Sequence, residues 1–95
     1  MPNSLATTSK ILKALAEPTR LRIVTRLRRE GPVTVLKLSQ ELDMHIATVS
    51  HHLSLLRQAG LIASAQRGRF VTYSLHPAAM NDGKLRCGAC QLEFA

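Results

Sequence analysis

The strongest constraint on the fold is a pair of short amphipathic patterns separated by three residues. In TVLKLSQELD, residues 34–43, apolar side chains recur at the spacing of one helix face. After the break Asp43-Met44-His45 the pattern resumes in IATVSHHLSLLRQAG, with Gly60 as the expected C-cap. Two helices joined by so short a break are typical of a helix-turn-helix, here at about 34–59. The apolar positions are Val35, Leu38 and Leu42, then Ile46, Val49, Leu53 and Leu56.

Two further helical patterns precede this pair. In TTSKILKALAE the apolar residues stand at helical spacing, and Thr8 or Ser9 is the expected N-cap. Pro18 ends that helix or opens the next one, PTRLRIVTRLRREG, which stops at Gly31-Pro32. The apolar positions are Ile11, Leu12 and Leu15 in the first helix, and Leu21, Ile23, Val24 and Leu27 in the second.

After Gly60 the period changes to that of strands. LIASAQ and FVTYSL flank the basic sequence RGR, which predicts a β-hairpin with a flexible, positively charged tip. A basic hairpin directly after a helix-turn-helix is a wing, here at about residues 61–75. We therefore expect residues 1–95 to form a single, mainly α, winged helix-turn-helix domain. The cysteine-containing tail, 77–95, contains Asn-Asp-Gly, which predicts a turn, and we expect the rest of it to be a short strand or an irregular segment.

The charge balance predicts an anionic partner. Thirteen Lys and Arg stand against six Asp and Glu, giving a net charge of +7. The sequence has no apolar run of about 18 residues and no basic–apolar secretion signal, so we expect no membrane span and a cytoplasmic location. One Tyr, two Phe and no Trp are too few aromatic residues to stack single-stranded bases, which favours double-stranded DNA.

The outer face of the 46–58 helix has the side chains that a major-groove contact needs. Opposite its apolar side lie residues that are small or hydrogen-bonding, whereas an ordinary solvated face is usually rich in Glu and Lys. The candidate residues on this helix are Ala47, Thr48, Ser50, His51 and Ser54. His51 and His52 are about 100° apart on a helix, so His51 faces outward and His52 turns toward the apolar side, where we expect a structural role.

Three segments together resemble the ArsR/SmtB family of winged-helix bacterial transcriptional regulators. They are ALAEPTRLRIVTRL, LSQELDMHIATVSHHLSLLRQAGLI and RGRFVTYSL, which lie within about residues 12–76. The resemblance implies a homodimer that binds palindromic operator DNA and represses transcription until an effector, which the sequence does not identify, releases it. It also implies groove-facing roles for Ala47, Thr48, Ser50 and His51. Arg57, Arg67 and Arg69 become candidates for phosphate or minor-groove contacts, and Tyr73 is expected to be packed.

The sequence departs from the family at three places. Thr34 and Leu36 occupy the two cysteine positions of the best-known metal sensors, and neither side chain binds a soft metal. His45 replaces the usual Ser that caps the recognition helix, a change that costs around 1 kcal/mol. No amphipathic C-terminal helix is evident, so dimerisation is expected to rest more on Ile11, Leu12 and Leu15 of the first helix, with the C-terminal segment as a second candidate.

Cys87 and Cys90, in CGAC, leave three interpretations open. They are inert or structural thiols, a reversible disulfide pair, or metal ligands. A structural zinc needs about four ligands, which two copies of the pair in a dimer would supply. Apart from this zinc ion, we expect no cofactor.

No arrangement of catalytic residues is evident, so we expect no enzyme activity. The alternative to DNA binding is a winged-helix protein-interaction module, which the basic wing and the positive net charge disfavour.

Overall fold

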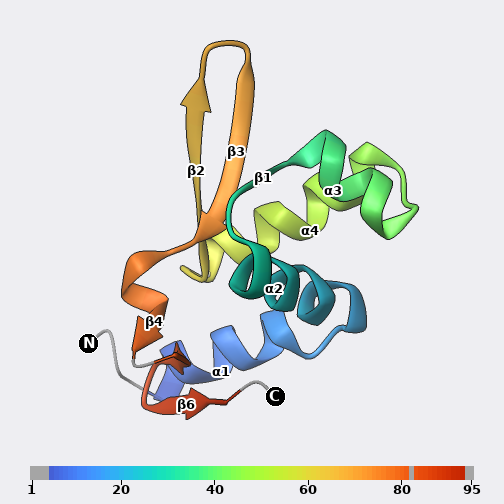
Figure 1. Cartoon of the computed structure of the whole chain (residues 1–95). Coiled ribbons are helices and arrows are strands. Elements are labelled where there is room, and N and C mark those ends of the chain that lie inside the picture. Colours follow the sequence, from blue (N-terminus) through green and yellow to red (C-terminus); the bar gives the residue numbers. More distant parts are fainter. Residues whose placement is uncertain (1–4, 82, 94–95) are drawn as a thin grey trace.

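Four helices and two small antiparallel sheets make up the described part of the chain (Figure 1). The structure is a computed structural model that describes residues 5–81 and 83–93. The helices are α1 (Leu5–Leu15), α2 (Pro18–Glu30), α3 (Val35–Leu42) and α4 (Ile46–Gln58), with a 3₁₀ turn, η1 (Pro77–Ala79). The strands are β1 (Val33–Thr34), β2 (Ile62–Arg67), β3 (Phe70–Leu75), β4 (Met80–Asn81), β5 (Lys84–Cys87) and β6 (Cys90–Leu92).

The start of α1 differs from the prediction. The helix begins at Leu5, so neither Thr8 nor Ser9 is its N-cap. Thr8 is instead buried inside the helix, and its Oγ1 accepts a hydrogen bond from the Ala89 N–H at 2.7 Å. The hydroxyl that suggested a local cap therefore makes a long-range contact. Pro18 opens α2 rather than ending α1.

The helix-turn-helix is confirmed as α3 and α4. Thr34 caps α3, because its side chain accepts the Lys37 N–H, and α3 ends at Asp43 in the left-handed conformation, with φ +54°. His45 is the N-cap of α4 but makes no side-chain hydrogen bond there. The departure from Ser noted in the sequence thus leaves this helix start without a side-chain acceptor.

The end of α4 lies one residue before the predicted cap. Ala59 is the C-cap, and Gly60 follows it with φ +80°. The Gly60 N–H donates to the Arg57 carbonyl, and the Leu61 N–H donates to the Leu56 carbonyl. This pair of bonds is a Schellman motif, in which glycine takes the left-handed position without strain.

The core lies where the four helices meet the bases of both sheets. Its fully buried centre includes Ile23, Leu38, Val49 and Leu53. Three residues that the helical patterns assigned to apolar faces are partly exposed instead: Leu12 at 40%, Leu21 at 38% and Ile46 at 44%.

The wing is a twisted hairpin with one additional short strand. β2 and β3 pair from Ile62↔Leu75 to Arg67↔Phe70 around a Gly68-Arg69 turn, which confirms the predicted hairpin. The unpredicted strand β1 pairs with β3 next to the start of α3. Tyr73 is half-buried against the core, as expected. In Figure 1 the hairpin projects well beyond the helices.

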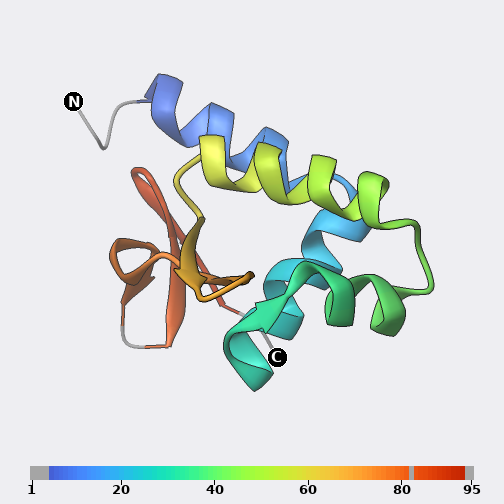
Figure 2. The same cartoon turned by 90° about the horizontal axis from the view of Figure 1, so that it is seen from above.

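The predicted tail is a folded sheet rather than an irregular segment. β4, β5 and β6 pair in order, and Leu85 and Cys87 are fully buried in the core. The Asn-Asp-Gly turn predicted here falls between β4 and β5, and its Asp82 lies outside the described residues, so the turn stays a prediction. Figure 1 shows this sheet beside α1, at the end of the molecule opposite the wing tip. In Figure 2 α4 lies alongside α1, and these two helices are in contact.

Candidate nucleic-acid interface

One face of α4 is anchored in the core, and the opposite face is available to a partner. Val49, Leu53 and Leu56 are fully buried, which holds the helix in place. The predicted groove-facing residues differ in exposure: Ala47, Thr48 and His51 are exposed, whereas Ser50 and Ser54 are half-buried. The exposed members of this predicted set therefore lie in the first two turns of the helix.

The two histidines separate as helical geometry predicts. His51 is exposed, whereas the His52 side chain is only 14% exposed. His52 Nδ1 lies 3.3 Å from Arg20 Nη1 and 3.7 Å from Glu17 Oε2. Arg20 Nε also donates to the Ala14 carbonyl at 2.6 Å. This polar cluster ties α4 to the junction of α1 and α2, which gives His52 a positioning role.

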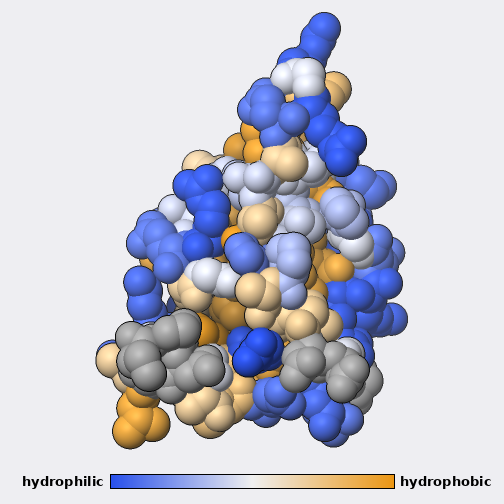
Figure 3. Space-filling view, turned by 90° about the vertical axis from the view of Figure 1, so that its left-hand side faces the viewer, coloured by the Kyte–Doolittle hydropathy of each residue, from blue (hydrophilic) through white to orange (hydrophobic). Residues whose placement is uncertain are grey.

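The predicted arginines lie at the end of α4 and on the wing. Arg57 is exposed near the end of α4 and donates to Ser64 Oγ on β2 at 3.5 Å. Arg67 and Arg69 are exposed at the wing tip, where Gln66 Nε2 donates to the Gly68 carbonyl at 2.7 Å. Figure 3 shows hydrophilic side chains gathered over this tip.

Acidic residues are absent from this whole segment. Between Asp43 and Asp82 the sequence contains no Asp or Glu, so α4 and the wing have no carboxylate of their own. The Glu41 carboxylate on α3 is paired: Arg26 Nε donates to Glu41 Oε1 at 2.8 Å, and this hydrogen bond lowers the pKa of the Glu41 carboxyl. The positive charge of α4 and the wing is therefore left for an anionic partner.

Two exposed residues near this surface were missed by the sequence reasoning. Lys37 is exposed on α3, one turn after the Thr34 cap, and Phe70 is 57% exposed beside the wing tip. Lys37 lies off the apolar face of α3, which was a usable signal. The exposure of Phe70 depends on how far the hairpin projects, which its sequence does not indicate.

The cysteines lie far from the wing tip, in the second sheet. Both are free thiols; Cys87 is buried and Cys90 is exposed. Burial raises the pKa of the Cys87 thiol, and a charge on nearby Cys90 raises it further. Among residues 5–81 and 83–93 no group of three or more His, Cys, Asp or Glu could hold a metal ion. A zinc ion shared between two copies therefore stays a prediction.

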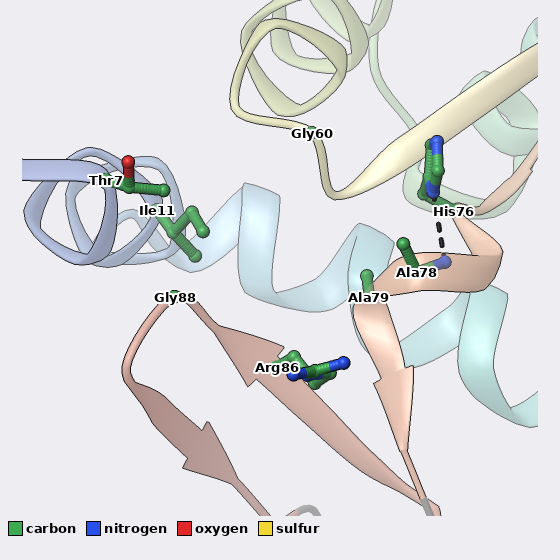
Figure 4. A pocket seen from close by; sticks show the side chains of 8 residues that line it. All are labelled: Thr7, Ile11, Gly60, His76, Ala78, Ala79, Arg86 and Gly88. Carbon is green, nitrogen blue, oxygen red and sulfur yellow. Dashed lines mark hydrogen bonds between the residues drawn. The ribbon is translucent and has the colours of Figure 1, made fainter. Parts of the chain in front are cut away.

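A pocket of about 440 Å³ lies between α1, the end of α4 and the second sheet (Figure 4). Its floor is apolar, and Arg86 projects from β5 toward η1. Two lining residues belong to segments next to α4 and the wing: Gly60 follows α4, and His76 follows β3. The His76 N–H donates to the Leu61 carbonyl at 2.9 Å, which holds these two segments together. The lining consists of Thr7, Ile11, Gly60, His76, Ala78, Ala79, Arg86 and Gly88, without a carboxylate.

None of the helices in the described part of the chain is long and apolar enough to cross a membrane.

Comparison with known proteins agrees with this geometry. A family model described as a helix-turn-helix domain matches residues 15–65. The chain is 42% identical to the HTH-type transcriptional regulator NmtR of Mycobacterium tuberculosis over 71 residues, which are 75% of this chain and 58% of NmtR. It is 31% identical to the transcriptional repressor SdpR of Bacillus subtilis over 74 residues, which are 78% of this chain and 81% of SdpR.

A solved structure has the same fold. It is the homodimeric winged helix-turn-helix DNA-binding domain of Mb0332 from Mycobacterium bovis, with a TM-score of 0.74 and 27% identity. The match covers 78% of this chain and 68% of that one. The chain spans just over half the length of NmtR, and the family's helix-turn-helix and wing both lie within the matched fold. The chain is thus a member of the ArsR/SmtB family of winged helix-turn-helix transcriptional regulators.

Proposed function

We propose that the chain is a homodimeric repressor that binds a two-fold symmetric site in double-stranded DNA. The observation that carries the proposal is that α4, with its exposed first turns, and the adjoining basic wing contain no Asp or Glu between Asp43 and Asp82. A helix of this diameter fits the major groove, and a projecting basic hairpin reaches the flanking backbone. A cytoplasmic location belongs to the same proposal.

The exposed residues of α4 have distinct roles in this arrangement. Ala47 and Thr48 are small enough for close approach, and Thr48 and His51 offer hydrogen bonds to base edges. Ser50 is half-buried, so only a partner that approaches α4 closely can contact it. The Ser54 hydroxyl already accepts a hydrogen bond from Gln58 Nε2 at 3.1 Å, so we assign it at most a backbone contact.

The arginines supply affinity that does not depend on sequence. Arg67 and Arg69, exposed at the wing tip, and Arg57, on the last turn of α4, are assigned to phosphates or to the minor groove. Their charges release counterions from DNA, so binding should weaken steeply as salt rises.

The dimer contact has to differ from the one expected from the sequence. Ile11 and Leu15 are buried inside the subunit, so they are not available to a second copy. The exposed large apolar residues of α1 are Leu12 at 40% and Leu5 at 81%. We assign the contact to this side of α1, in line with the homodimer formed by the similar domain of Mb0332.

A gel-shift titration under reducing conditions tests the proposal. Labelled random and genomic duplexes are titrated at two salt concentrations with the wild type, Arg69→Ala and Arg86→Ala. Arg86→Ala removes the same charge at the opposite end of the molecule. We expect binding to weaken with salt and Arg69→Ala to weaken it further, while Arg86→Ala stays close to the wild type. Equal losses of DNA affinity in both variants would show that the wing does not contact the DNA. No binding to either duplex pool would favour a protein-interaction module.

A further inference from the structure

The CGAC segment forms a tight turn that brings two thiols together. Cys87 and Cys90 are register partners of β5 and β6, separated only by Gly88-Ala89. Gly88 has φ +64°, whereas Ala89 is not among the residues with positive φ, the combination typical of a type II′ turn. Directly opposed residues that close such a turn have Cα atoms about 5.5 Å apart, within the range of about 4.4–6.8 Å that a disulfide spans.

The two thiols are unequal in a way that suits stepwise oxidation. Cys90 is exposed and able to meet a dissolved oxidant, whereas Cys87 is fully buried. Arg86, which precedes Cys87, lines the pocket beside the turn together with Gly88 (Figure 4). Because side chains alternate along a strand, Arg86 points to the opposite face of β5 from the Cys87–Cys90 pair, so a dissolved disulfide reaches this site through the exposed Cys90 thiol.

We propose that Cys87 and Cys90 form a reversible dithiol–disulfide site whose oxidant is a low-molecular-weight disulfide. The Cys90 thiolate attacks one sulfur of the oxidant, forms a mixed disulfide and expels one thiolate. The Cys87 thiolate then attacks Cys90 Sγ, forms the intramolecular disulfide and expels the second thiolate. Each expelled thiolate takes up one of the two protons that the cysteines release, so one disulfide is reduced for each one formed.

The turn is in direct contact with α1, which gives oxidation a structural consequence. The Ala89 N–H donates to the buried Thr8 Oγ1 at 2.7 Å, and no space for a side chain remains between Gly88 and Thr8. A disulfide bond of about 2.05 Å constrains the side-chain torsions of both cysteines. We expect the Gly88-Ala89 turn, which joins them, to adjust to this constraint by shifting against Thr8.

α1 passes this displacement toward the DNA-binding face. It contacts α4 directly, and the Ala14 carbonyl at its end accepts the Arg20 hydrogen bond that continues to His52 of α4. We therefore expect oxidation to shift α4 and to weaken DNA binding. This second part of the inference rests on the proposed function; formation of the disulfide does not.

The experiment uses the full chain equilibrated with mixtures of reduced and oxidised glutathione. Thiol counting and mass spectrometry should show the loss of two thiols and two hydrogen atoms from the wild type. Cys90→Ser, altered at the exposed position, should retain its remaining thiol, and Cys87→Ala should stop at the mixed disulfide. Only mixed disulfides, or only disulfides between chains, in the wild type would overturn the site.

The coupling has its own readouts. The amide resonances of Thr8, Gly88 and Gly60 should shift on oxidation, while that of Gly68 at the wing tip serves as internal control. DNA affinity should fall about fivefold or more in the wild type and stay unchanged in Cys90→Ser. A disulfide that moves only the Gly88 resonance and leaves DNA affinity unchanged would overturn the coupling. Absence of DNA binding in the reduced protein, with the disulfide still forming, would overturn the proposed function alone.

Discussion

Gly88→Ala tests how firmly the C-terminal sheet is docked on α1. A Cβ at residue 88 would overlap Thr8 Oγ1 and lie 3.0 Å from both the Cα and the N of Thr8. Because two of these atoms belong to helix backbone, a side-chain rotation cannot relieve the clash. Alanine would also have to adopt φ +64°, which costs about 1 kcal/mol.

The expected cost follows from these terms. Overpacking against a helix backbone costs about 1–3 kcal/mol, and displacement of the turn removes the Ala89–Thr8 hydrogen bond, which is worth about 1 kcal/mol. With the strained φ included, we expect Gly88→Ala to lower the free energy of unfolding by about 3–5 kcal/mol.

Gly68→Ala is the matched control. Gly68 starts the turn at the wing tip with φ +62°, and an added Cβ there has no atom within 4 Å. This variant should lose only about 1 kcal/mol, the cost of the strained φ. Urea unfolding of both variants, under reducing conditions and at one protein concentration, gives the difference. Losses that agree within about 0.5 kcal/mol would refute the docking of the second sheet on α1.

Three further predictions concern the helices and the interface. His45→Ser should raise the free energy of unfolding by about 1 kcal/mol in urea, because it supplies the acceptor that α4 lacks at its N-cap. The Glu41 carboxyl has its pKa lowered below 4.5 by the hydrogen bond from Arg26, so its stabilisation is present above 4.5 and is lost as pH falls through the lower folded-state value. The melting temperature of Glu41→Gln should therefore fall less than that of the wild type on acidification, and equal falls would contradict the argument. His51→Ala should change base preference at one position per half-site, whereas Arg69→Ala should weaken all sequences alike and lower the salt slope by about one, both measured by fluorescence anisotropy.

The helix-turn-helix could be predicted because its signals are local. The apolar spacing in residues 34–60, a three-residue break and a glycine after α4 all act within a turn or two of helix. The width of the buried face of a helix, by contrast, cannot be predicted from the local sequence. Leu12, Leu21 and Ile46 stand at its edges, and their partial exposure depends on which elements pack beside them.

The C-terminal sheet could not be predicted with the same success. Its strands are short, and Leu85 and Cys87 become core residues because α1 and η1 pack against β5. Thr8 illustrates the same limit, since its partner is 81 residues away in the sequence. From the sequence alone, a polar residue near the start of a helix is interpreted as a cap, because its distant partner in the β5–β6 turn is not yet known.

The same distinction between local and long-range information applies to the residues of the candidate interface. The outward direction of Ala47, Thr48 and His51 follows from helical geometry alone. The hydrogen bond between Ser54 and Gln58, and the one between Arg57 and Ser64, depend on side-chain conformations and on the position of the wing. The pattern therefore identified the face, whereas the structure determines which of its side chains are free to bind.

The most direct measurement is selection of binding sites from a random pool of duplex DNA by the reduced wild-type protein. We expect enrichment of a two-fold symmetric sequence whose half-sites lie about one helical turn apart, roughly 34–36 Å, each contacted by one copy of α4. Enrichment of a single, asymmetric half-site would contradict the symmetric dimer. A pool that stays random after selection would contradict sequence-specific recognition by α4.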